Sequence, residues 1–176
     1  LTLIFSLIQN VLGQEKGVMS AEEIFTEIKL NSQQSKNPNK ILYESFLDKI
    51  KSDVYSEQTK NELAVSLFSH YIKCGSFLAF KTAFEKHAAL LENKPILKTY
   101  WKTISLEFSE QYKAMFKSAE MLLRQSKKAG DNQNISDAYR LIARSKMYLN
   151  EKDSSFFYAN LSLNFAKRSD LSLIHI

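Results

Sequence analysis

His70 and Cys74 are the residues whose types and spacing come nearest to a metal-binding pair. Residues four apart on a helix share one face, which is a spacing that paired metal ligands use. Two ligands do not make a metal site, and no further His or Cys lies nearby in the sequence. We therefore interpret His70 as a packing residue and Cys74 as a small buried thiol, and we predict no metal site.

Sequence motifs for catalysis and for phosphate binding are missing. The chain has no Gly-rich phosphate loop, no Gly-x-Ser-x-Gly elbow, no His-Glu-x-x-His and no Cys-x-x-Cys. Glu57 and Asp153 lie at predicted helix starts, where capping and the positive end of the helix dipole account for them. His87 falls on the apolar face of its predicted helix. We predict a protein that is not an enzyme, with no cofactor and no small-molecule substrate.

The charge of the chain is basic but dispersed along the sequence. The formal net charge is +5, and 24 Lys and Arg are interspersed with 19 Asp and Glu without a block of like charges. Nucleic-acid binders concentrate cations on one face or in a tail. We interpret the charge as an ordinary solvated surface and keep non-specific nucleic-acid binding as an alternative.

The composition favours long helices joined by short loops. The chain has 176 residues, 44% of them hydrophobic, with only four Gly and two Pro. A sandwich or barrel would need more turn residues, and this length suffices for a continuous core. The sequence therefore predicts an all-α protein.

Apolar residues recur at one-turn spacing and predict about eight helices in four antiparallel pairs. Polar and turn residues set the boundaries of the last six helices. Ser56 caps the third helix and Gly75 ends it, the fourth spans residues 77–91, Pro95 opens the fifth, Ser109 ends the fifth and caps the sixth, Gly130 and Asp131 end the sixth, and Asp153 caps the eighth.

The amino end supports two interpretations. Leu1 to Leu12 has the length of the apolar part of a signal peptide, followed by Gly13 at a position that a signal peptidase accepts. The same residues also fit an amphipathic core helix that Gly13 would end. We divide the chain into a signal-peptide remnant (1–13), an N-terminal helix pair (14–55), helical repeats (56–170) and the start of a further, truncated helix (171–176).

Two segments resemble the tetratricopeptide repeat superfamily. The first is Leu67 to Gly75, which carries the Leu, the aromatic and the turn Gly of that pattern. The second begins at Tyr139, Ile142 and Ala143, turns at Asn150 and Glu151, and continues with small residues where the helices cross, namely Ser155, Ala159 and Ser162. Aligned on Leu67, Thr103 and Ile142, the repeats are 36 and 39 residues apart. The resemblance implies a right-handed solenoid of antiparallel helix hairpins.

The resemblance also implies a groove that binds a protein or peptide, with acidic groups in the partner suited to its cations. The alternative is that Trp101 is a core residue and the cations are merely solvated. The predicted groove positions are Val65, Ser69, Ile72, Lys73, Lys98, Trp101, Ser105, Arg140, Arg144 and Tyr148.

Similar repeats in bacterial signalling proteins imply an exported interaction segment of a larger regulator, periplasmic or membrane-associated. A cytoplasmic adaptor is the alternative, and it would hold if Leu1 to Leu12 packs as a helix.

Overall fold

The computed structural model describes residue 26 and residues 55–174, with side chains through residue 169. The chain divides into two compact units, residues 1–67 and 68–176. Thr26 is helical and exposed. The predictions for a signal peptide and for the first helix pair otherwise lie outside the described residues.

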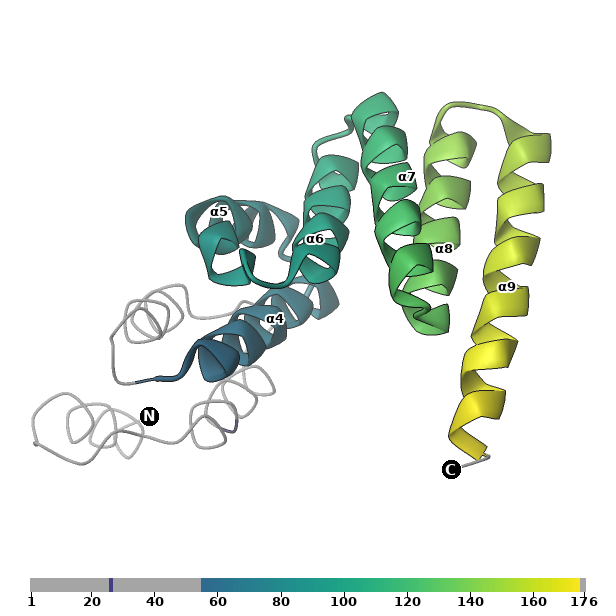
Figure 1. Cartoon of the computed structure of the whole chain (residues 1–176). Helices are drawn as coiled ribbons and strands as arrows, with labels where there is room; N and C mark the ends of the chain where they lie inside the picture. The colour runs from purple at the N-terminus through teal and green to yellow at the C-terminus, as the bar shows by residue number, and fades with distance from the viewer. Residues whose placement is uncertain (1–25, 27–54, 175–176) are drawn as a thin grey trace, which may run out of the picture. The chain divides into compact units, whose positions relative to one another are not determined.

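Residues 55–174 form six α-helices and one short 3-10 helix, and no strand occurs among the described residues. The all-α prediction is confirmed for this part of the chain. Within residues 68–176, α6 packs on α7, α7 on α8 and α8 on α9 (Figure 1). None of these described helices is long and apolar enough to cross a membrane. The elements are α4 (Glu57–Lys73), α5 (Phe77–His87), η1 (Ala88–Leu91), α6 (Pro95–Phe108), α7 (Tyr112–Ala129), α8 (Asn132–Tyr148) and α9 (Lys152–Ile174).

Most predicted helix boundaries are confirmed. The Ser56 hydroxyl accepts a hydrogen bond from the Thr59 N–H at 3.2 Å, as an N-cap does. Pro95 is at the start of α6, where its missing N–H has no intrahelical partner to lose. Gly130 is the C-cap of α7, as predicted, and the next residue, Asp131, also caps α8 by accepting from the Asn134 N–H at 2.9 Å, which was not predicted.

Four predicted boundaries differ from those in the structure. Ser109 ends α6 but does not cap α7, because its hydroxyl donates to the Ser105 carbonyl and α7 begins only at Tyr112. Asp153 lies inside the first turn of α9 and not before it. Residues 171–174 continue α9 to Ile174, so they do not start a further helix. The fourth predicted helix is also shorter, because it passes into η1 after His87.

The same turn ends four of the helices. At each end, one residue has positive φ and two backbone N–H groups bond back to the last helical turn, which is the Schellman arrangement. For α7, these bonds run from Gly130 to Lys127 and from Asp131 to Ser126. The positive-φ residues are Gly75 (69°), Glu110 (57°), Gly130 (68°) and Asn150 (61°). Those that end α4, α6 and α8 lie 35 and 40 residues apart, which matches the repeat period in the sequence.

The core has an aromatic end and an aliphatic end. Phe68 contacts Phe80, Phe84 and Trp101 with ring centroids 5.6–5.9 Å apart, in edge-on geometry that aromatic pairs prefer. Between α7 and α8 the buried residues are smaller, namely Met115, Ala119, Leu122, Ile135, Ala138, Leu141 and Ile142.

Small polar residues join neighbouring helices within this core. The hydroxyls of Thr103 on α6 and Ser118 on α7 lie 2.8 Å apart. On α8 and α9, Ser136 and Ser162 each donate to the other's carbonyl, at 2.8 and 2.9 Å. Short side chains permit this close approach, and the hydrogen bonds satisfy the buried hydroxyls.

Candidate functional site

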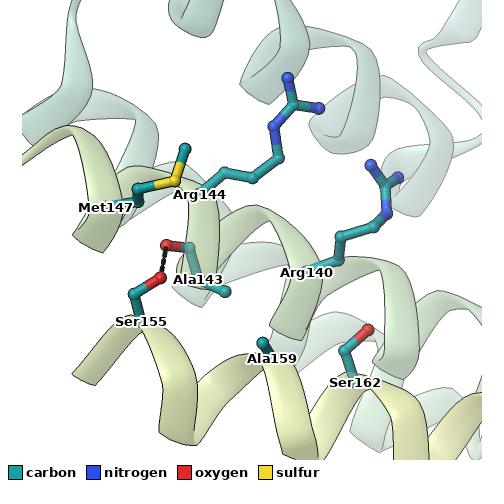
Figure 2. A pocket seen from close by; sticks show the side chains of 7 residues that line it. All are labelled: Arg140, Ala143, Arg144, Met147, Ser155, Ala159 and Ser162. Atoms are coloured by element: carbon teal, nitrogen blue, oxygen red, sulfur yellow. Dashed lines mark hydrogen bonds between the residues drawn. The ribbon is translucent and has the colours of Figure 1, made fainter. Parts of the chain in front are cut away.

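A pocket of about 270 Å³ lies between α8 and α9 (Figure 2). Its lining includes one alanine from each helix, the buried Ala143 and the exposed Ala159, and Met147, which is 53% exposed. The volume is slightly below the range of pockets that enclose a whole small ligand. It suits one side chain of a larger partner. The lining residues are Arg140, Ala143, Arg144, Met147, Ser155, Ala159 and Ser162.

The two serines of the pocket fix its walls. Ser155 donates to the Ala143 carbonyl at 2.9 Å (Figure 2), and Ser162 donates to the Ser136 carbonyl. Both hydroxyl groups therefore donate to backbone carbonyls of α8. What the pocket offers a ligand is mainly the apolar surface of Ala143, Ala159 and Met147.

Arg140, at one side of the pocket, is held by groups of the protein. Its Nη2 donates to Asp137 Oδ1 at 2.8 Å and to the Tyr100 hydroxyl at 3.3 Å. Burial opposes the charge of Arg140, but the hydrogen bond and charge of Asp137, together with Tyr100, outweigh it, and the pKa of Arg140 lies above its ordinary value. Asp137 balances this cation before any ligand binds.

Arg144 is balanced in the same way, by a buried carboxylate on α6. It forms an ion pair with Glu107 Oε1, which also accepts from the Tyr148 hydroxyl at 3.2 Å. Tyr148 in turn stacks on Tyr112, with ring centroids 4.4 Å apart. Burial raises the pKa of Glu107 above its ordinary value, and the opposing effects of Arg144, Tyr148 and Arg140 do not cancel the rise.

The structure brings together only part of the predicted groove. Arg140 and Arg144 line one pocket, and Tyr148 joins Arg144 through Glu107. Lys98 forms an ion pair with Glu92, and Lys73 is an exposed residue at the end of α4; neither lines the pocket.

Two predicted groove positions are wrong because they are buried. Trp101 is only 6% exposed and contacts the aromatic core, and Ser105 is 7% exposed. The alternative interpretation of Trp101 as a core residue is therefore the correct one. Its large ring stabilises the fold more by burying its apolar surface beside Phe68 and Phe80 than it would on the protein surface.

Exposed apolar side chains extend the surface of the pocket along α9. Phe156 is 72% exposed and Leu163 is 53% exposed. They lie three residues before and four residues after Ala159, so they share its side of the helix. Such grouped apolar exposure is typical of an interaction surface.

His70 and Cys74 lie side by side, with Cys74 Sγ 3.3 Å from His70 Nε2. Burial and the charge of Lys73 lower the pKa of His70. Among the described residues, no group of three His, Cys, Asp or Glu side chains is placed to hold a metal ion.

Glu107 is the main residue of this region that the sequence analysis missed. A signal was present, because Glu107 lies three residues after Ile104, on the apolar side of α6. An acidic residue in such a position needs a partner when it is buried, and Arg144 is that partner.

No family model, curated protein or solved structure matches this chain. The resemblance to tetratricopeptide repeats therefore rests on the residues of the chain itself, and the pocket between α8 and α9 is the main evidence on function.

Proposed function

We propose that this chain is a non-catalytic scaffold that binds a protein or peptide, and that the pocket between α8 and α9 receives one apolar side chain of that partner. The observation that carries the proposal is the pocket itself, which Ala143, Ala159 and Met147 help to line. Methionine side chains adapt to differently shaped partners because they are unbranched and polarizable.

The charges around the pocket favour an apolar anchor over an acidic one. Asp137 and Glu107 already pair with Arg140 and Arg144. A partner carboxylate would have to compete with these internal acids and would gain little. An apolar side chain would bury apolar surface of Ala143 and Ala159. This burial stabilises the complex by about 25 cal/mol per Å² and disturbs neither ion pair.

The wider architecture in this proposal is a right-handed solenoid of helix hairpins, similar to tetratricopeptide repeats. The repeated positive-φ turns at Gly75, Glu110 and Asn150 support it, because they end alternate helices at nearly constant spacing. Export as part of a larger bacterial regulator, or a cytoplasmic adaptor role, stays a prediction, since residues 1–13 lie outside the described part.

Peptides selected from a random display library on the wild-type chain provide the test. Ala159→Trp should fill the pocket, and because Ala159 is exposed the variant should still fold. Asn160→Trp is the matched control: Asn160 is the exposed neighbour on α9 and does not line the pocket. We expect the selected peptides to carry an apolar anchor and to lose at least tenfold in affinity with Ala159→Trp only, which is about 1.4 kcal/mol.

Equal peptide affinity for both tryptophan variants would contradict the proposal, as would a library that yields no binder above background. Circular dichroism of both variants checks that their helix content equals that of the wild type.

A further inference from the structure

The positive charge of the chain is concentrated on one helix. α7 carries five cations and one carboxylate, a net charge of +4, while the whole chain has a net charge of +5. The sequence analysis missed this concentration because the cations are separated by other residues. Four of them and one Met follow each other at helical spacing on the exposed side of α7. This α7 stripe consists of Lys113, Lys117, Met121, Arg124 and Lys128.

The four cations of the stripe are unpaired within the described part of the protein. No ion pair or hydrogen bond links any of the four to a described side chain, in contrast to Arg140 and Arg144. The opposite side of α7 is the one that packs, through buried residues such as Met115, Ala119 and Leu122. The stripe is therefore an exposed charged surface whose cations have no partner among the described side chains.

The shape of the stripe limits what it can bind. It is one side chain wide, and at 1.5 Å per residue its charges extend over about 22 Å along a straight helix. The middle position is apolar, because Met121 is 36% exposed between Lys117 and Arg124. A second helix placed alongside could present carboxylates at the same one-turn spacing and an apolar residue opposite Met121.

We propose that the α7 stripe docks an acidic amphipathic helix of a partner protein. The carboxylates of that helix pair with Lys113, Lys117, Arg124 and Lys128, and its apolar residue packs on Met121. The proposal rests on the proposed role in protein binding, but it concerns a surface separate from the pocket between α8 and α9.

Two other polyanions fit the stripe less well. Single-stranded nucleic acid is bound by cations combined with aromatic platforms, whereas the aromatic residues of α7 are occupied: Tyr112 stacks on Tyr148, and Phe116 lies under Lys146. A membrane surface needs a broad apolar face beside the cations, and Met121 alone does not provide one.

The test uses a synthetic helical peptide with Glu at the spacing of the four cations and Leu opposite Met121. We expect it to bind the full chain at low salt and to weaken as salt rises. Arg124→Glu with Lys128→Glu should weaken binding at least tenfold. Lys102→Glu with Lys167→Glu makes the same charge change at exposed positions elsewhere and should leave the affinity within about twofold.

A charge swap and a change at Met121 make the test decisive. A peptide with Lys opposite positions 124 and 128 should bind the reversed variant better than the wild type, which excludes misfolding as the cause of the loss. Met121→Lys should weaken the acidic peptide, because it removes the apolar contact. It should strengthen binding of a DNA oligonucleotide or of phosphatidylserine vesicles, because it adds a cation.

The proposal is overturned if the acidic peptide fails to bind the wild type, if both double variants weaken it equally, or if DNA or vesicles bind more tightly than the peptide. These outcomes leave the pocket proposal intact, since Ala159→Trp does not touch α7. Equal peptide affinity for the two tryptophan variants would likewise leave the stripe proposal intact, whereas a library without binders would count against the protein-binding role on which it rests.

Discussion

Arg144 on α8 forms an ion pair with Glu107 on α6, whose side chain is only 3% exposed. The other carboxylate oxygen of Glu107, Oε2, is buried and meets no hydrogen-bond donor among the described residues. The two residues are 37 positions apart in the sequence, and the pair links α8 to α6. It also explains why Arg144 is not a free cation beside the pocket.

Glu107→Gln should change how the stability of the protein depends on pH. The pKa of Glu107 is raised in the folded state, mainly by burial, so the folded chain binds more protons than the unfolded chain between the ordinary value of 4.5 and the raised pKa. The contribution of Glu107 to the free energy of unfolding therefore falls as pH rises through this window. Urea unfolding over a pH series should show the wild type losing stability relative to Glu107→Gln. If the wild type instead became more stable relative to the variant as pH rises, the attraction of Arg144 would dominate the pKa of Glu107.

Arg144→Ala should destabilise the protein because it leaves the Glu107 charge buried with less compensation. We expect a loss of about 1–3 kcal/mol in the free energy of unfolding at neutral pH. The same substitution in a Glu107→Gln background should cost clearly less, and a double-mutant cycle measures the difference. Additive effects would show that the two side chains do not interact energetically.

Substitutions at two of the positive-φ positions, Gly130 and Glu110, should have opposite effects on stability. Gly130→Ala should destabilise by about 1 kcal/mol through backbone strain alone, because an added Cβ would meet no atom within 4 Å. Glu110→Gly should stabilise, or cost nothing, since Glu110 is exposed and already holds φ at 57°. Thermal unfolding checks both. A stabilising Gly130→Ala would contradict the geometry of that turn.

Trp101 is the single tryptophan of the chain, and it reports directly on the aromatic core. Because it is buried, its fluorescence should be blue-shifted in the folded chain and resist quenching by iodide. Trp101→Ala should cost about 3–5 kcal/mol through the cavity that it leaves beside Phe68 and Phe80. Emission typical of solvent-exposed indole in the folded protein would restore the groove interpretation.

The helices were largely predictable from sequence because their signals are local. Apolar spacing identified α4 to α9, and Ser56, Gly75, Pro95 and Gly130 marked ends that the structure has. The error at Ser109 has a cause in the backbone. A helix start depends on the φ and ψ angles of its capping residue, and here Glu110 takes a left-handed conformation that its residue type does not announce.

The candidate site was less predictable because it depends on contacts between helices. Arg140 and Arg144 were recognised, but their partners Tyr100 and Glu107 lie 40 and 37 residues away. Ser155, Ala159 and Ser162 were expected as small crossing residues, and they contribute one wall of the pocket. Trp101 was misplaced because its groove position was taken from the repeat resemblance, which does not show that this ring contacts Phe68 and Phe80.

The most direct test of the scaffold proposal is an NMR titration of the chain, labelled at its alanine methyl groups, with a display-selected peptide. The account predicts that the methyl signals of Ala143 and Ala159 shift and saturate together, while those of the fully buried Ala119 and Ala138 stay in place. Saturable binding that leaves Ala143 and Ala159 unshifted would contradict it.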